Sequence, residues 1–178
     1  MASKQRIVIF LRGVNLGATN KVPMARLRQA VSDAGADDVS TFIASGNVLC
    51  VPPGNASAFV RTVEQLIAEQ FDVRTTAVSR TPAQLRAARA AFPFDVHDEK
   101  LCAISFLERK PTKAAVAALA EADHGGDRAQ VIGKELHLRY GNGVQTSRMT
   151  GPRLARLLGT DGTVRNLRTV DALIDLLN

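Results

Sequence analysis

The order of apolar patterns in the first 80 residues is the feature that most constrains the fold. Short β-branched runs alternate with segments whose apolar residues recur at helical spacing. The predicted segments are a strand over 6–11, a helix over 24–34, strands over 39–43 and 48–51, a helix over 59–67 and a strand over 73–79. This β-α-β-β-α-β order is typical of a ferredoxin-like unit.

The second half of the chain predicts a related order. A capping box, Thr81 to Gln84, opens a short helix, and Thr169 is expected to cap the last helix, which runs through Leu177. The elements between them are a strand over 101–107, a helix over 112–122, a hairpin over 128–132 and 135–140, and a helix over 154–158. We therefore expect an α+β fold of two ferredoxin-like halves, residues 1–80 and 81–178, with mainly antiparallel sheets and helices packed on one face.

Composition limits the class of protein. The 178 residues carry 46% apolar residues and a net charge of +6, which is ordinary for a globular chain of this size. Two cysteines without metal-type spacing argue against a disulfide framework, and no run approaches the length of a membrane span. These features predict a cytoplasmic protein that does not enter a membrane.

Much of the positive charge lies near the C-terminus. Between Arg139 and Arg168 there are six arginines and a single acid, Asp161. Such an asymmetry fits an anionic partner, but an Arg- and Ala-rich composition also arises without any binding role. Both interpretations stay open at this point.

The loop from Arg12 to Lys21 is the first candidate site. It follows a predicted buried strand and precedes a helix, and it contains Asn15, two glycines and two cations. The glycines allow close approach of a ligand, and a helix N-terminus favours anions. The spacing matches neither a phosphate-binding P-loop nor a dinucleotide fingerprint. A structured turn is the competing interpretation.

Two further candidates are polar segments elsewhere in the chain. Ser45-Gly46-Asn47 is either a hairpin turn or a pair of hydrogen-bonding side chains, Ser45 and Asn47, beside the first loop. Residues 141–148 and 163–169 carry cations in segments that precede helices, or they are simple capping loops. Their candidate ligand-binding residues are Arg148, Arg165, Asn166 and Arg168.

Neither a metal site nor a set of catalytic residues is evident. The three histidines, His97, His124 and His137, lack the spacing of metal ligands, and Cys50 and Cys102 lie in strand patterns where buried thiols are expected. No cofactor is predicted, and no catalytic residue is assigned.

Several motifs resemble those of a bacterial family known as domain of unknown function sixteen ninety-seven. They are LRGVNLGATNKVPM from Leu11, STFIASGNVL from Ser40, PFD from Pro93, GNGVQTSRMT from Gly141 and TVRNLRT from Thr163. The resemblance implies an α+β fold of two ferredoxin-like halves and supplies no established activity. The chain departs from the family pattern at Ala18, Phe42 and Leu167, where Gly, Tyr and Trp are usual.

These observations lead to three hypotheses about function. In the first, the polar loops form one cleft that binds a phosphate-bearing or other anionic small ligand, and nucleic acid is a less favoured partner because aromatic residues are few. In the second, the same cleft serves a small-molecule transferase or hydrolase. In the third, the loops only brace a non-catalytic interaction module. Oligomeric state is not predicted.

Overall fold

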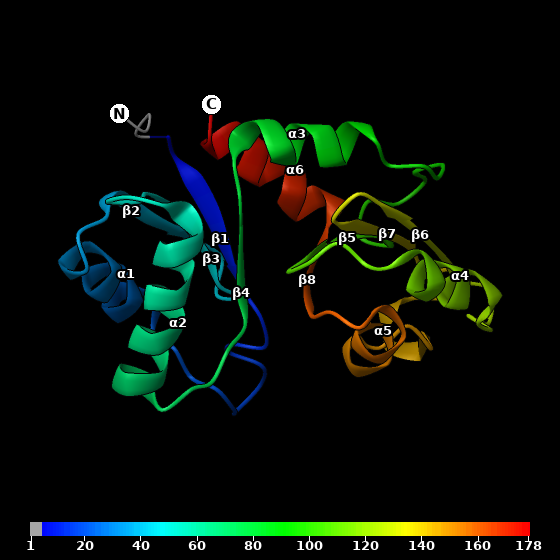
Figure 1. Ribbon diagram of the computed structural model, residues 1–178, viewed down its shortest axis with the longest axis horizontal. Coiled ribbons are helices and arrows are strands. Elements are labelled where there is room, and N and C mark those ends of the chain that lie inside the picture. Colours follow the sequence, from blue (N-terminus) through cyan, green and yellow to red (C-terminus); the bar gives the residue numbers. More distant parts are fainter. Residues whose placement is uncertain (1–4) are drawn as a thin grey trace. The chain divides into compact units, whose positions relative to one another are not determined.

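The structure is a computed structural model that describes residues 5–178, and its helices and strands are shown in Figure 1. The chain forms two compact units. The first comprises the residues up to Leu85 together with Leu173–Asn178, and the second comprises Arg86–Ala172. The sequence analysis placed residues 173–178 in the second half, whereas in the structure they cluster with the first unit.

The first unit contains a four-stranded antiparallel sheet with strand order β2-β3-β1-β4. Its elements are β1 (Ile7–Leu11), α1 (Met24–Asp33), β2 (Asp37–Phe42), β3 (Asn47–Val51), α2 (Ala56–Phe71) and β4 (Ala77–Arg80). The last strand starts later than the predicted 73–79. Thr75 explains the difference, because its hydroxyl donates to the carbonyl oxygen of Arg12 at 2.7 Å, in a loop contact that precedes the strand ladder.

The core of the first unit lies between its sheet and two helices. Alternate residues of β1, namely Ile7, Ile9 and Leu11, point into a buried cluster that also contains residues of α1 and α2. Val63 and Ile67 of α2 are one helical turn apart and are both fully buried in this cluster. Figure 1 shows α1 and α2 on the same face of the sheet, as the amphipathic patterns predict.

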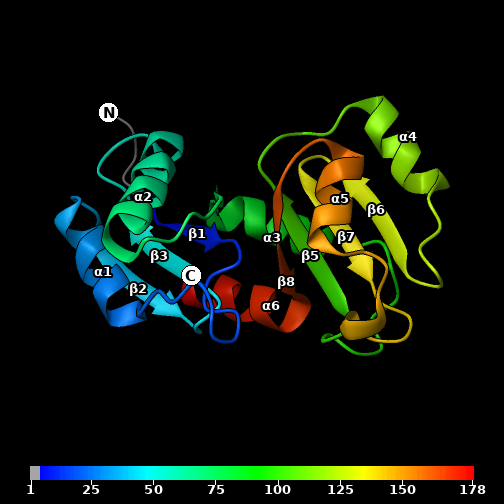
Figure 2. The same ribbon diagram turned by 90° about the horizontal axis from the view of Figure 1, so that it is seen from below.

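The second unit repeats this topology. Its elements are β5 (Cys102–Leu107), α4 (Lys113–Glu121), β6 (Arg128–Ile132), β7 (Glu135–Arg139), the 3₁₀ turn η1 (Val144–Thr146), α5 (Gly151–Leu158) and β8 (Gly162–Asn166). Two helices, α3 (Pro82–Ala90) and α6 (Leu167–Leu176), belong partly to this unit and partly to the first. The strand order β6-β7-β5-β8 matches that of the first sheet when the strands are numbered from β5. Helices α4 and α5 lie over one face of this sheet (Figure 2). The predicted α+β fold with two similar halves and antiparallel sheets is therefore confirmed.

One strand escaped the sequence analysis. The sequence analysis described residues 163–169 as a polar segment before a helix, but residues 162–166 form β8, which pairs with β5 through Ile104 opposite Arg165 and Phe106 opposite Thr163. The pattern was hidden because two of the buried positions of this strand, Thr163 and Arg165, are polar. The expected cap of the last helix was also wrong: Asn166 fills that place, since its Oδ1 accepts from the backbone N–H of Thr169 at 2.9 Å.

Other helix caps agree with the sequence. In the predicted capping box, the Thr81 N–H donates to Gln84 Oε1 at 2.9 Å and the Gln84 N–H donates to Thr81 Oγ1 at 3.2 Å. Asn55 and Thr112 cap α2 and α4 with one hydrogen bond each, because their side-chain oxygens accept from the N–H groups of Ala58 and Ala115. Within residues 5–178, every helix is too short or too polar to cross a membrane.

The two units share a buried arginine at the same place in the sheet. Arg80 stands opposite Val8 on the fourth strand of the first sheet, and Arg165 stands opposite Ile104 on the fourth strand of the second. Each Nη1 donates at 2.8 Å to the carbonyl oxygen of the preceding residue. Burial lowers the pKa of Arg165 to about 10. This repeated arrangement of charge adds to the topological similarity of the two units.

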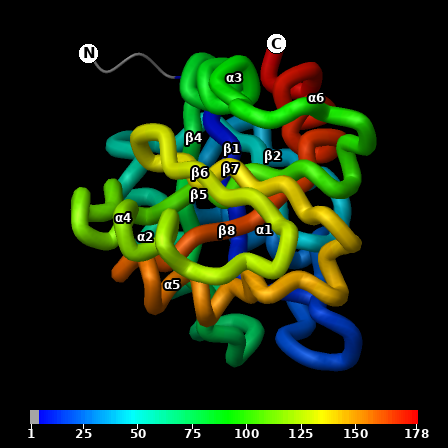
Figure 3. The backbone as a smooth tube through the Cα atoms, turned by 90° about the vertical axis from the view of Figure 1, so that its right-hand side faces the viewer, coloured from blue at the N-terminus to red at the C-terminus, as the bar shows by residue number. Residues whose placement is uncertain are grey.

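Helices α3 and α6 run side by side in Figures 1 and 3. Arg89 of α3 and Asp171 of α6 join them through two hydrogen bonds, at 2.7 Å from Nε and 3.2 Å from Nη2. Both residues belong to the second unit. Two hydrogen bonds between a guanidinium and a carboxylate fix the relative orientation of the two side chains better than one hydrogen bond would.

His137 is a buried polar residue in the middle of β7. It is 0% exposed, and neither ring nitrogen finds a hydrogen-bond partner among residues 5–178. The Phe92 ring packs edge-on against it, with 5.5 Å between ring centroids. Burial lowers the pKa of His137 from 6.5 to about 4, so the imidazole is neutral in the folded protein at neutral pH.

We expect His137 to make the protein sensitive to mild acid. Between pH 6.5 and about 4 the unfolded chain binds a proton that the folded protein does not, so the free energy of unfolding falls as pH falls. The difference in pKa corresponds to about 3 kcal/mol. Urea denaturation of the wild type and of His137→Leu from pH 7 to 4 measures this effect. An identical loss of stability in both proteins would contradict the assignment.

Candidate functional site

Asn15 holds together the loop that follows β1. Its Nδ2 donates to the carbonyl oxygens of Val22 and Ala44, at 2.9 and 2.8 Å, and its Oδ1 accepts from the Val22 N–H at 2.8 Å. Its own N–H donates to the Asn20 carbonyl oxygen at 2.8 Å. The side chain therefore joins both ends of the loop to the turn between β2 and β3.

Gly46 explains why that turn can pack on the loop. It has a φ of +89°, and a Cβ atom built on it would lie 2.7 Å from Val14 Cγ2 and 2.8 Å from Leu11 Cβ. Its carbonyl oxygen accepts from the Leu11 N–H at 2.8 Å. A residue with a side chain would meet both an unfavourable backbone conformation and a steric clash. The Leu11–Asn15 segment and the Ser45-Gly46-Asn47 turn thus form one packed unit.

The remaining predicted residues of the first unit lie around this packed turn. Asn47 is buried, and its Nδ2 donates to the Phe42 carbonyl oxygen at 2.9 Å and to Ser45 Oγ at 3.4 Å. Arg12 is half-buried, and its backbone bonds to Thr75 and Thr76. Lys21 is exposed, and its Nζ donates to the Gly17 carbonyl oxygen at 2.5 Å. Ser45-Gly46-Asn47 thus forms the turn between β2 and β3, as the hairpin interpretation predicted, and this turn packs on the first loop.

A separate hollow of about 370 Å³ lies in the second unit. Two polar turns form it, residues 123–127 after α4 and residues 141–148 after β7. Its lining residues are His124, Gly125, Asp127, Asn142, Thr146 and Arg148. Arg148 is the member of this set that the sequence analysis selected as a ligand-binding residue.

Arg148 lies against the backbone of the facing turn. Its Nη1 forms an exposed ion pair with Asp123 Oδ2. A Cβ atom on Gly125, which has a φ of +64°, would lie 3.2 Å from Arg148 Nε, so the absence of a side chain there makes room for the guanidinium. The pKa of Asp123 lies below its ordinary value, first because the Gly125 N–H donates to it and then because Arg148 is close.

Asp127 connects the two turns. Its Oδ1 accepts from the Gly141 N–H at 2.7 Å, and its Oδ2 accepts from Ser147 Oγ at 2.6 Å. Ser147 Oγ accepts in turn from the Met149 N–H at 2.9 Å. With both oxygens engaged, the carboxylate of Asp127 positions the loop and is poorly placed to act as a base.

His124 completes the wall of the hollow. Its Nε2 lies 2.7 Å from the Leu119 carbonyl oxygen, which can only accept, so Nε2 carries the proton. Its Nδ1 is buried and has no hydrogen-bond partner within the described chain. Among residues 5–178, no group of three or more His, Cys, Asp or Glu side chains is placed to hold a metal ion.

The other predicted residues of the second unit have different settings. Arg165 is buried on β8, and Asn166 caps α6, so neither belongs to the flexible polar loop that the sequence analysis expected. Arg168 is exposed in the first turn of α6. The strand register brings the end of β7, at Arg139, and the end of β8 to the same edge of the sheet, since both flank the start of β5.

The sequence analysis missed the turn at 123–127. The sequence did contain a pattern typical of a turn, because Asp123 and Asp127 lie on either side of a pair of glycines. Such a turn is unremarkable by itself, because its partner segment lies about twenty residues further along the chain. Only the fold shows that the acids fasten the turn to Arg148 and Ser147.

The fold and the motifs place this chain among α+β proteins with two similar halves. It belongs to the family described as "Protein of unknown function (DUF1697)", whose model matches residues 4–137. This match includes the packed loop and turn of the first unit and ends before residues 141–148. No curated protein matches the chain.

A solved structure has a similar fold. It is described as that of the conserved bacterial protein SP0830 from Streptococcus pneumoniae, with a TM-score of 0.72 and 20% sequence identity. The similarity covers 97% of this chain and 98% of that one. At this level of identity it shows the fold alone.

We expect Gly46→Ala to lower the free energy of unfolding by about 2–4 kcal/mol, because it combines backbone strain with a clash. Gly54→Ala is the matched control, since a Cβ atom there would have no neighbour within 4 Å and its φ is not in the left-handed region. Urea denaturation of both variants measures the difference. Equal stabilities would show that the turn does not depend on close packing.

Proposed function

We propose that this protein binds a small phosphate-bearing or other anionic ligand in the hollow of the second unit. The observation that carries the proposal is the position of the Arg148 guanidinium on the wall of a polar hollow of about 370 Å³. A guanidinium presents several N–H donors in a planar fork that fits phosphate and carboxylate oxygens. Asn142 and Thr146 line the same space and supply further hydrogen-bonding groups.

The ion pair with Asp123 does not prevent this role. Arg148 and Asp123 side chains are 58% and 73% exposed, and such pairs contribute roughly 0–1 kcal/mol. Asp123 uses Nη1 of Arg148, which leaves other donors of the guanidinium for a ligand. The carboxylate therefore acts as a weak internal competitor that keeps the guanidinium in place before a ligand arrives.

The geometry favours binding over catalysis at this hollow. A transferase or hydrolase needs a general base or a nucleophile that is free to reach its substrate. Asp127 accepts two hydrogen bonds from the facing turn, and Ser147 is bonded between Asp127 and the Met149 N–H. We therefore assign no reaction to these groups.

The first unit supports a second candidate function, a non-catalytic interaction module. The amide groups of Asn15 and Asn47 bond mainly to backbone carbonyl oxygens, and Asn166 of the second unit bonds to a backbone N–H. These side chains are engaged in holding loops together. Arg12 and Lys21 keep exposed or half-exposed charge beside the packed turn, and their contribution to one cleft with Ser45, Arg165 and Arg168 remains a prediction.

Two substitutions at the hollow should have opposite effects. Arg148→Gln should weaken binding of inorganic phosphate at least about tenfold, because a charged hydrogen bond is lost. Asp123→Asn should strengthen it about two- to fivefold, because it removes the competing charge and keeps an acceptor for the Gly125 N–H. An NMR titration that follows the amide signals of Gly125, Asn142 and Thr146 measures both.

The control is Arg61→Gln, which removes the same charge from an exposed position of α2 and does not line the hollow. It should change phosphate affinity less than about twofold. The proposal is wrong if phosphate shifts none of these signals at millimolar concentration, or if Asp123→Asn weakens binding.

A further inference from the structure

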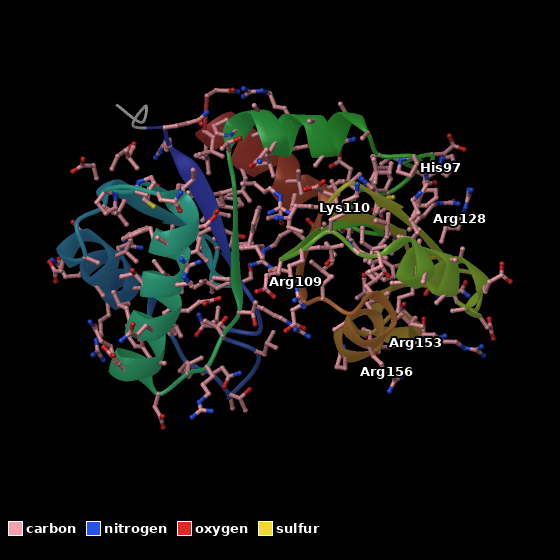
Figure 4. All side chains as sticks on the ribbon, in the orientation of Figure 1. His97, Arg109, Lys110, Arg128, Arg153 and Arg156 are labelled. Carbon is pink, nitrogen blue, oxygen red and sulfur yellow. The ribbon has the colours of Figure 1, made fainter. Side chains whose placement is uncertain are left out.

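A row of arginines follows α5 beyond the hollow. Arg153 and Arg156 lie one helical turn apart on the side of α5 that faces away from the sheet, and Figure 4 labels both, together with Arg109. Arg109 reaches the C-terminal end of α5, where its Nη2 donates to the Gly159 carbonyl oxygen at 3.1 Å. Arg148 begins the row, since its carbonyl oxygen accepts from Arg153 Nη1 at 3.4 Å. We call Arg148, Arg153, Arg156 and Arg109 the α5 arginine row.

Most of this charge is not neutralised. Of the residues that the structure describes, Arg148 pairs with Asp123, while Arg109, Arg153 and Arg156 form no ion pair. Arg153 and Arg109 donate to carbonyl oxygens, which fix their side chains. Asp123, which already pairs with Arg148, also offsets part of the charge of Arg153. Glu108 and Glu121 are exposed acids on the neighbouring β5–α4 connection and on α4, and they reduce the local potential without binding these arginines.

The position of Arg153 is unfavourable for the helix itself. It lies in the first turn of α5, where the partial positive charge of the helix dipole disfavours a cation. Thr150 at the N-cap accepts no hydrogen bond from that turn through its side chain in the described structure. Helix stability therefore does not account for Arg153, and the dipole adds to the positive potential at this end of the row.

The length and chemistry of the row fit a particular partner. Eight residues of α-helix span about 12 Å, and one strand of duplex DNA carries a phosphate for about every 3.4 Å of helix axis. A duplex laid along α5 therefore presents several phosphates within the length of this helix. The large apolar residues that are exposed on the described chain are all aliphatic, which disfavours a site that stacks unpaired bases.

We propose that the α5 arginine row binds the phosphodiester backbone of a nucleic acid duplex without reading its sequence. This inference goes beyond the proposed function, because Arg109, Arg153 and Arg156 do not line the hollow. Binding by phosphate contacts alone is typically in the range of about 10⁻⁴–10⁻⁶ M at physiological salt. It falls steeply as salt rises, because counterions are released from the duplex.

The test is fluorescence anisotropy with labelled duplex DNA, duplex RNA and single-stranded DNA of equal length, across 50 to 200 mM salt. Four phosphate contacts predict a loss of duplex DNA affinity of about 150-fold over this range. The variant R153Q/R156Q retains two contacts, so its loss should be only about 12-fold. R153K/R156K should restore the wild-type salt dependence, because it restores the charge.

The matched control is R61Q/R74Q, which removes two exposed arginines of the first unit that have no partner among residues 5–178. It should bind the duplexes with the wild-type salt dependence. Similar affinity for duplex DNA and duplex RNA supports a backbone contact. Binding to the single strand alone, no duplex binding at 50 mM salt, or an unchanged slope in R153Q/R156Q would overturn the inference.

Because Arg148 is unchanged in these variants, the experiment is independent of the phosphate titration of the hollow. Arg148→Gln should lose phosphate binding in the hollow but keep three contacts of the row, so its duplex affinity should fall about 40-fold over the same salt range. Circular dichroism melting of each variant shows whether it is folded, and a folded variant with a changed slope identifies a contact with phosphate.

Discussion

The burial of two central strands, β1 and β5, is the constraint on which the rest of the structure depends. Both are buried along their whole length, so every backbone N–H and C=O in them must find a partner within the protein. Each strand meets this requirement by pairing with a neighbour on both sides. The chain can then leave the sheets only at strand ends, and the polar loops that hold the candidate residues begin and end there.

The loops are ordered by amide and carboxylate side chains that bond to the backbone. Asn15 fastens the loop after β1, and Asp127 fastens the turn after β7 to the turn after α4. Leaving a buried backbone group of such a loop unpaired would lower the stability of the protein by roughly 1–3 kcal/mol. These side-chain contacts therefore contribute to the stability of the fold. Because these amide and carboxylate groups are engaged within the loops, the groups that stay available to bind a partner are mainly arginines. Arg148 faces a hollow, and Arg153 and Arg156 face away from the sheet.

The comparison of sequence with structure follows the same logic. The strand at 7–11 was predicted closely from its continuous apolar run. The helix at 56–71 was predicted over its central part, 59–67, because its buried residues recur at helical spacing there. β8 was missed because Arg165 and Thr163 occupy buried positions that a pattern search expects to be apolar. Among the site residues, Arg148 was found from its polar loop, while Asp123 and Asp127 were not, because their partners are distant in sequence.

The sequence by itself determined the order of the elements apart from β8, the similarity of the two halves and the segments in which polar residues gather. It did so because local periodicity and turn residues report directly on local conformation. Tertiary structure decided what each polar residue does. Gly46 is a packing requirement because Val14 and Leu11 press against it, and Asn166 is a helix cap. Arg148 faces a hollow because a turn from another part of the chain, at Gly125, leaves room for it. These roles depend on distances between segments that are far apart in sequence, which no local pattern encodes.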